Sequence, residues 1–247
     1  LMQGAYTWAR AFTNLQANIS ATGNGQNLDS GDPSNAAQQY GLDTGYRPQR
    51  LVINYSWDLP YKKTDGFSGK LLGGWTLSGV TIVQDGQPMN ITDIAGGSIY
   101  CGGCQAAFSN VQSRAEMAPG ATYADVPTPG GVEARLGGVS GGPGYFNAKA
   151  FGALPVIGDG TGWGNSGIGI IQGPGQFNFD VSMVKTTRVG GLRENAVLQF
   201  RAEFFNLFNH AQFANPVSTD VTQENFGQIT ATSVNPRLIQ FALKYLF

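Results

Sequence analysis

The chain has 247 residues, and its 15 basic and 16 acidic side chains leave a formal net charge of −1. A chain so close to neutral has no broad electrostatic attraction for nucleic acid or anionic lipid, so no nucleic acid is expected as a partner. The 36 glycines and 15 phenylalanines favour many strands joined by tight turns and glycine-rich loops. No run of 18 apolar residues occurs, which excludes a transmembrane helix. Transmembrane strands stay open, because each gives an alternating signal of only about ten residues.

Six segments show the alternation of apolar and polar residues that is typical of β-strands. The first is the least regular, and the chain starts at Leu1 without an initiator methionine, as a fragment of a longer protein would. A missing signal peptide therefore says little about location. In chain order, the predicted strands are residues 5–19, 51–59, 74–91, 177–183, 198–204 and 238–247.

The connections between these strands alternate between short and long. Residues 61–73 form a polar turn of moderate length, and Gly190–Gly191 forms a very tight one, whereas residues 93–175 form a very long connection. Loops of that length are usually functional or disordered. In outer-membrane barrels the short turns lie on the periplasmic side and the long loops face outward. Six strands with this alternation put both ends of the chain on the short-turn side.

The Gly190–Gly191 turn also predicts a register, because two-residue hairpin turns need positive φ at their centre. The turn sets Val181 opposite Phe200 on the apolar face and Asp180 opposite Arg201 on the polar face. A slip by one residue would bring apolar against polar side chains at every pair. The register should therefore be strongly specified.

The chain ends on an apolar strand with no polar tail. Its alternate positions Ile239, Phe241, Leu243, Tyr245 and Phe247 form one apolar face. Alternation alone also fits a soluble β-sandwich, but the termini of soluble proteins usually fray in water. The terminal strand therefore favours a transmembrane β-barrel. It resembles the C-terminal signal by which the barrel-assembly machinery of the outer membrane recognises its clients.

The apolar strand faces are expected to contact membrane lipid as one continuous surface. Its predicted members are Leu51, Ile53, Tyr55, Trp57, Leu59, Phe177, Phe179, Val181, Leu198, Phe200, Ile239, Phe241 and Leu243. An interfacial aromatic girdle is expected at the short-turn end, made by Trp57, Trp75, Tyr245 and Phe247.

Several segments resemble the TonB-dependent receptors, and among them the Oar-like barrels. Residues 199–210 (QFRAEFFNLFNH) look like the motif of their penultimate strand. The approach to their last strand is similar to residues 227–230 (GQIT) followed by 235–237 (NPR). Their last large outer loop is similar to residues 145–147 (YFN) with Phe151, then 164–167 (GNSG) and 173–175 (GPG). The resemblance covers most of the chain from Arg50 onward.

The resemblance implies a barrel of about 22 strands, a plug inside it and a TonB-contacting segment before the plug. Six strands cannot close a barrel, since about eight is the smallest number known. We therefore expect an all-β, antiparallel up-and-down transmembrane barrel segment that is incomplete on its own. Residues 1–247 would be the C-terminal portion of the barrel, with an extracellular loop region at 93–175. The expected partners are outer-membrane lipid, the barrel-assembly machinery, the upstream strands and plug, and TonB through the upstream part.

Residues with catalytic or metal-binding chemistry are few. The only histidine, His210, has no expected partners as a catalytic base, so we expect no catalytic residue, no cofactor and no enzyme activity. Cys101 and Cys104, in the segment YCGGCQ, fit a short disulfide that pins an outer loop in an oxidising compartment. A zinc site or a redox-active pair is the alternative for these cysteines, although a zinc site usually needs four ligands.

Four charged residues fall on the polar strand faces: Asp180, Arg201, Glu203 and Lys244. In a barrel they would line the lumen, where they would pair with one another or with the plug, or contact substrate. The first function hypothesis is therefore a wall segment of an energy-coupled receptor that imports a scarce nutrient. The alternatives are a passive porin or small barrel enzyme, and a soluble β-rich binding or adhesion domain.

Overall fold

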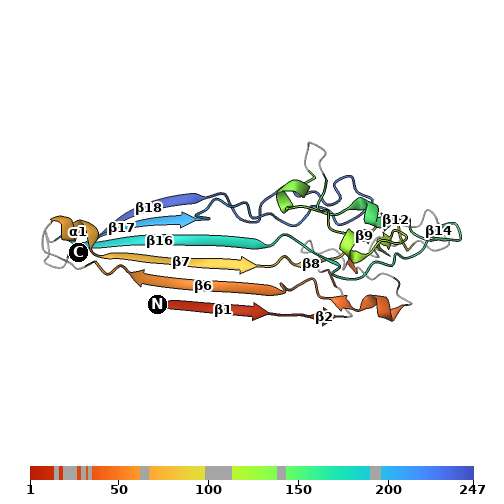
Figure 1. Ribbon diagram of the computed structural model, residues 1–247, viewed down its shortest axis with the longest axis horizontal. Helices are drawn as coiled ribbons and strands as arrows, with labels where there is room; N and C mark the ends of the chain where they lie inside the picture. Colours follow the sequence, from red (N-terminus) through yellow and green to blue (C-terminus); the bar gives the residue numbers. More distant parts are fainter. Residues whose placement is uncertain are drawn as a thin grey trace.

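The computed structural model describes residues 1–13, 17–18, 27–28, 32, 35–61, 67–97, 113–137, 143–189 and 196–247. Its main feature is one antiparallel sheet of six long strands, which lie side by side in Figure 1. In sheet order they are β1 (Met2–Trp8), β6 (Gln49–Asp58), β7 (Trp75–Gln84), β16 (Gln176–Arg188), β17 (Val197–Phe205) and β18 (Leu238–Leu246). Each of these long strands pairs with the long strand before it and the long strand after it in the sequence. The predicted all-β up-and-down class is therefore confirmed.

Shorter elements lie in the connections. The short connection between β6 and β7 contains α1 (Phe67–Leu72). The first long connection contains β2 (Phe12–Thr13), β3 (Ala17–Asn18), β4 (Asn27–Leu28), η1 (Ala36–Gln39) and β5 (Gly41–Leu42). The second contains β8 (Pro88–Met89), β9 (Thr92–Asp93), β10 (Ser113–Arg114), β11 (Glu116–Met117), η3 (Tyr123–Asp125), η4 (Val132–Arg135), η5 (Ala148–Ala150), β12 (Phe151–Gly152), β13 (Val156–Ile157), β14 (Gly160–Thr161) and β15 (Ile171–Gln172). Within the described residues, no helix is both long and apolar enough to span a membrane.

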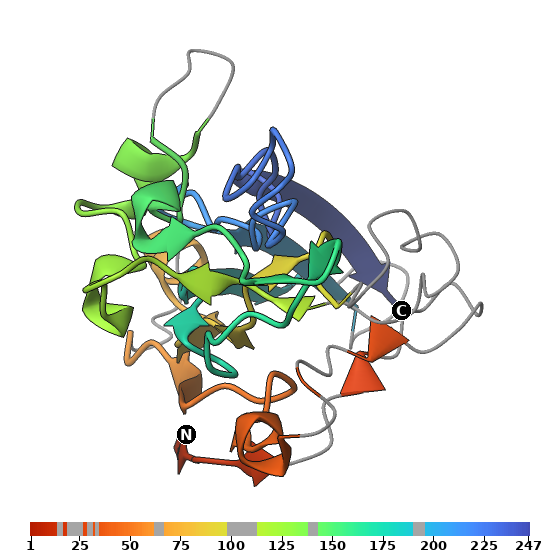
Figure 2. The same cartoon turned by 90° about the vertical axis from the view of Figure 1, so that its right-hand side faces the viewer.

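The long connections pack together at one end of the sheet, and we call this region the loop layer. It lies at the right of Figure 1, and Figure 2 looks onto it along the sheet. Short strands from distant parts of the sequence pair there, such as β8 with β15 and β11 with β12. A buried apolar cluster fills it, made by Met89, Ile91, Ala115, Val126, Tyr145, Phe146, Ala150, Ile171 and Ile229. The apolar core of the described chain therefore lies in its loops, outside the sheet.

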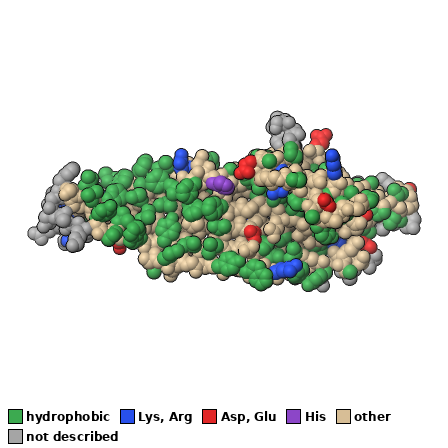
Figure 3. Space-filling model, viewed as in Figure 1, with side chains coloured by type: hydrophobic (Ala, Val, Ile, Leu, Met, Phe, Trp, Pro, Cys, Tyr) green, Lys and Arg blue, Asp and Glu red, His purple; other side chains and the backbone are tan. Residues whose placement is uncertain are grey.

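The register carries one apolar face across all six strands. Residues directly opposite each other in antiparallel strands point to the same side of the sheet. Such pairs link Tyr6 to Leu51, Leu51 to Val83 and Val83 to Phe177. On the other half of the sheet, Val181 lies opposite Phe204, and Phe204 opposite Ile239. Every predicted member of the continuous apolar surface that lies within a strand is on this face, whereas Leu59 lies just beyond the end of β6. Figure 3 shows hydrophobic side chains gathered over the strands.

Gly79 shows how closely the side chains of this face cover the backbone. It lies directly opposite Tyr55, and a Cβ atom placed on Gly79 would be only 2.6 Å from the Tyr55 hydroxyl oxygen. The tyrosine ring therefore lies over the glycine, an arrangement that compensates for the missing side chain in a strand. The apolar face stays continuous at a position where the sequence alone shows a gap.

The predicted aromatic girdle lies at the short-turn end of the sheet. Trp57 is near the end of β6, Trp75 begins β7, and Tyr245 is near the end of β18, where its ring stacks on that of Phe247 at 5.8 Å. Lys185 also lies on this apolar face, opposite Trp75. Its ammonium lies 5.6 Å from the Trp75 ring and donates a hydrogen bond to the Gly73 carbonyl. A lysine beside aromatic rings is typical of the edge of an apolar band, where its charge reaches water.

The predicted register of the β16–β17 hairpin is wrong by four residues. Val181 lies opposite Phe204 instead of Phe200, and Arg201 lies opposite Val184 instead of Asp180. The innermost backbone hydrogen bond runs from the Val189 N–H to the Ala196 carbonyl, while the predicted turn at 190–191 lies outside the described residues. A period of two fixes only whether an offset is odd or even, so a shift of four leaves every side chain on its predicted face.

We expect Phe241→Arg to destabilise the protein by about 2–4 kcal/mol in a lipid bilayer, because an arginine in the middle of a lipid-facing strand is placed in hydrocarbon. The matched control is Gln240→Arg, one residue earlier in β18 on the polar face, where the charge should be tolerated. Both free energies of unfolding are measured by denaturant titration of the whole protein in lipid vesicles. Equal losses for the two variants would contradict the assignment of the faces.

Candidate functional site

The polar face of the sheet carries mostly neutral hydrogen-bonding side chains. Ser56, Ser78 and Ser182 lie opposite one another in a row across β6, β7 and β16. The same row continues with Glu203 on β17 and Gln240 on β18. Hydroxyl, amide and carboxylate groups of this kind hydrogen-bond water and polar solutes. This face therefore suits an aqueous or protein-filled space.

The predicted charged residues all lie on this face, but the structure does not join them into one cluster. Arg201 and Glu203, two positions apart on β17, form an ion pair with Nη1 and Oε1 3.4 Å apart. Lys244 lies on β18 opposite Gln199, the residue two positions before Arg201 on β17. Asp180 is separate, and its carboxylate accepts hydrogen bonds from the backbone N–H of Asn206 at 2.9 Å and from Asn178 Nδ2 at 3.0 Å. The predicted pairing of Asp180 with Arg201 is therefore wrong. Asp180 instead binds the backbone N–H of Asn206, the first residue after β17.

Asn206 organises the turn that follows β17. Its backbone has a φ of 50°, a left-handed conformation that asparagine tolerates better than most residues. Its side-chain Oδ1 accepts a hydrogen bond from the His210 N–H, and its Nδ2 donates one to the His210 carbonyl, both at 3.0 Å. Asn209, with a φ of 52°, donates its N–H to the Asn206 carbonyl at 2.8 Å. These bonds close a compact turn over residues 206–210, which we call the Asn206 turn.

Gln212 replaces the missing strand neighbour of β16, in an arrangement that we call the Gln212 clasp. Because β17 ends at Phe205, the first residues of β16 extend beyond it. The Gln212 amide accepts a hydrogen bond from the Phe177 N–H at 2.7 Å and donates one to the Phe177 carbonyl at 2.6 Å. These are the two bonds that a paired strand would make. Only 1% of Gln212 is exposed, so the side chain that forms the clasp is buried.

His210 completes the clasp and is held in a defined tautomer. Its Nδ1 lies 2.9 Å from Gln212 Nε2. The Gln212 amide nitrogen is a donor, so Nδ1 is the acceptor of this bond and Nε2 is the ring nitrogen that carries a proton. The ring meets Phe177 edge-on, with 6.4 Å between the ring centroids. No sequence pattern predicts the clasp, because it depends on the Gln212 side chain pairing with the Phe177 backbone 35 residues away.

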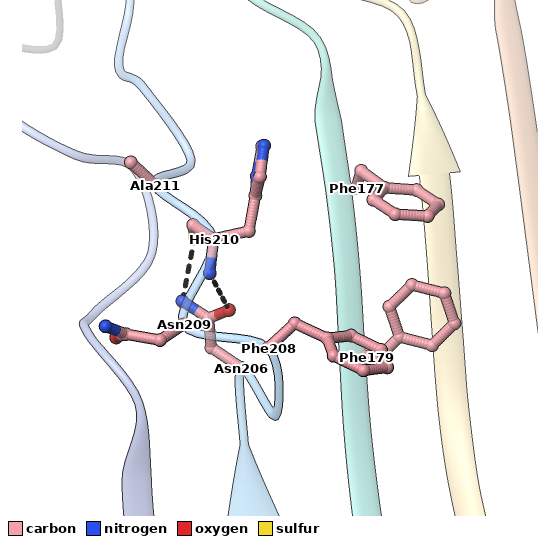
Figure 4. A pocket seen from close by; sticks show the side chains of 7 residues that line it. All are labelled: Phe177, Phe179, Asn206, Phe208, Asn209, His210 and Ala211. Atoms are coloured by element: carbon pink, nitrogen blue, oxygen red, sulfur yellow. Dashed lines mark hydrogen bonds between the residues drawn. The ribbon is translucent and has the colours of Figure 1, made fainter.

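The Asn206 turn and β16 line an open pocket of about 320 Å³ on the apolar face, shown in Figure 4. Its lining consists of Phe177, Phe179, Asn206, Phe208, Asn209, His210 and Ala211. The Phe208 ring packs edge-on against Phe179 at 5.1 Å, and Phe179 packs against Phe177 at 4.8 Å. Three aromatic rings and neutral polar groups make this a site for an apolar ligand with a hydrogen-bonding end.

Two aspartates are buried together in the loop layer. Asp93 accepts a hydrogen bond from the Ala95 N–H at 2.8 Å, and Asp220 accepts two from Thr222, at 3.0 Å and 2.9 Å. Burial raises the pKa of Asp93; the Ala95 hydrogen bond partly offsets this rise, and the nearby Asp220 carboxylate adds to it. In the described part of the chain, no three His, Cys, Asp or Glu side chains lie close enough to hold a metal ion. Cys101 and Cys104 lie outside the described residues, so the predicted disulfide stays a prediction.

Comparison with known proteins gives one family match. A family model described as an outer membrane beta barrel domain matches residues 1–240. No curated protein and no solved structure gives a significant match to the chain.

The Gln212 clasp can be tested by two substitutions at one position. Gln212→Leu should lower the free energy of unfolding by about 1–3 kcal/mol, because it leaves the N–H and C=O of Phe177 without their partners on the β17 side of β16. Gln212→Glu should cost less, since its carboxylate still accepts from the N–H. The control is Gln223→Leu, which removes an exposed glutamine with only weak bonds of 3.4 Å. Denaturant unfolding gives the energies, and amide exchange at Phe177 should speed up clearly in Gln212→Leu but not in Gln212→Glu or Gln223→Leu. Unchanged exchange there would show that the clasp does not protect β16.

Proposed function

This chain belongs to the outer membrane beta barrel domain family, and on that premise we propose that it is a C-terminal wall segment of a TonB-dependent receptor. Membership of the family places the chain in the bacterial outer membrane. The proposed receptor imports a scarce nutrient by energy-coupled transport. The chain would contribute wall, lumen charges and outer loops to this transport, and no enzymatic step.

The single observation that carries the proposal is the open, two-faced sheet. In the described structure, β1 and β18 each pair with a strand on one side only, so the six strands do not close. An unpaired strand edge in hydrocarbon leaves backbone groups unsatisfied, at several kcal/mol each. We infer that further strands, preceding β1 in a longer protein, complete the barrel. Large barrels of this kind have room for a plug.

The two faces give the proposed orientation of the wall. The apolar face would contact lipid, and the polar face, with Arg201, Glu203 and Lys244, would line the lumen. The Arg201–Glu203 ion pair is partly exposed, with 47% and 23% of the two side chains accessible, so it contributes little to stability. These charges are free to meet a plug or a passing solute. The loop layer would then form the outer end, where a receptor first meets its substrate.

The last strand supports the proposed role in assembly. Ile239, Phe241, Leu243 and Tyr245 lie on the apolar face of β18, and the other edge of this strand has no partner among the described residues. An exposed strand edge with an apolar face is a surface to which another strand can add. We propose that the barrel-assembly machinery recognises the chain there, with Phe247 as the terminal aromatic residue.

Replacing Tyr245 and Phe247 together by asparagine should lower the amount of whole protein inserted in the outer membrane several-fold, because the aromatic signal is lost. The control replaces Gln240 and Lys244, on the polar face of the same strand, by asparagine and should insert normally. The measurement is the protein detected at the cell surface relative to the amount synthesised. Full surface display of the aromatic variant would count against the assembly role.

Planar-bilayer recording of the purified whole protein separates the proposed receptor from a passive porin. A barrel filled by a plug should show no steady open conductance, whereas a porin should show open steps in every insertion. In parallel, the whole protein should bind the purified periplasmic domain of TonB. Steady porin-like conductance together with no TonB binding would overturn the receptor proposal and leave the outer-membrane barrel intact.

A further inference from the structure

The aromatic pocket at the Asn206 turn lies at the border between the apolar face and the loop layer. In Figure 3 the single histidine, His210, lies where the hydrophobic side chains over the strands meet the mixed surface of the loops. Phe177 and Phe179 belong to the same face as Phe241 and Leu243 through the strand pairing. Because the apolar face of an outer-membrane barrel contacts lipid, the pocket opens into the membrane. Because the long loops of such barrels face outward, it opens toward the outer leaflet.

The early end of β17 creates the hollow. Strand β16 continues to Gln176 while β17 stops at Phe205, so Phe177 and Phe179, which lie opposite Val83 and Thr81 of β7, have no strand side chain beside them on the β17 side. The Asn206 turn fills this gap only in part: Phe208 covers Phe179, and the small Ala211 leaves space beside His210. The Gln212 clasp satisfies the backbone behind the pocket without a side chain that projects into it. The hollow is thus built by the same residues that terminate the hairpin.

The chemistry of the lining selects among ligands. Its seven residues include three phenylalanines and no charged side chain, which disfavours a free anion or a phosphate group as the main occupant. His210 presents an Nε2–H donor, and among the described residues this donor has no hydrogen-bond acceptor. A volume of 320 Å³ lies near the lower end of the roughly 300–1,000 Å³ that ligand pockets span. The pocket therefore fits a slender apolar chain that carries an oxygen acceptor at its polar end.

We propose that this pocket holds one acyl chain of an outer-leaflet lipid, whose ester or amide carbonyl accepts a hydrogen bond from His210 Nε2. The site is continuous with the lipid-contacting face, so its occupant is already present at high concentration in the membrane. A chain that packs against three rings and accepts one hydrogen bond should exchange more slowly than lipid that only touches the flat strand surface. The proposal rests on the outer-membrane location of the chain and does not depend on TonB or on transport.

The test is retention of a defined lipid by the whole protein in detergent. The probe is dibrominated phosphatidylethanolamine, added to delipidated protein and detected by its bromine isotope pattern in native mass spectrometry. Ala211→Trp, which fills the pocket, should retain one lipid fewer per molecule than the unmodified protein. His210→Phe, which keeps a ring but removes the donor, should lower the occupancy of that lipid several-fold.

The control is Phe241→Ala, which removes an exposed aromatic ring from the same apolar face but outside the pocket. Phe241 is as exposed as the pocket residue Phe208, at 66%. This variant should retain lipid as the unmodified protein does. All variants are first checked for bilayer insertion, so that a misfolded protein is not counted as a lost site. Equal lipid retention in Ala211→Trp and in the unmodified protein would overturn the proposal. Equal loss in Phe241→Ala and Ala211→Trp would also overturn it, since it would show only general contact with lipid.

Discussion

Backbone hydrogen bonding in hydrocarbon is the constraint on which this structure depends. Inside a membrane no water is present to replace a missing partner, so each N–H and C=O must be paired within the protein. The six-stranded sheet satisfies this for its inner strands. Where β17 stops before its neighbour, the Gln212 side chain and the N–H of Leu207 take over the backbone of Phe177 and Phe179. The same constraint leaves β1 and β18 as edges that require partners.

The two faces of the sheet follow from the same geometry, because alternate side chains of a strand must point to opposite sides. One face is apolar from Tyr6 to Ile239, while the other presents serine, amide and charged groups. Lys185 is an exception on the apolar face, and its position beside Trp75 marks the end of the apolar band. At the opposite end, the Asn206 turn ends the band with a pocket instead of a charge.

The strands were predictable from the sequence because alternation is a local signal. The same signal fixed the faces of Asp180, Arg201, Glu203 and Lys244 but not their neighbours, since a shift of four residues in the β16–β17 register preserves every face. The loop layer was not predictable. Its core joins residues from Met89 to Ile229, and its glycine-rich segments show no period. The Gln212 clasp was missed for a related reason, because a side chain that pairs with a distant backbone leaves no pattern in the sequence.

Strand β16 should cross the membrane as part of a barrel wall, with lipid on one side and a polar space on the other. Spin labels placed singly at each position from Phe177 to Val184 of the whole protein in lipid vesicles would show which side each residue faces. Odd positions should be accessible to oxygen, which concentrates in lipid, and even positions to a water-soluble nickel chelate or to neither reagent. If odd and even positions were equally accessible to the nickel chelate, β16 would not separate lipid from a polar space.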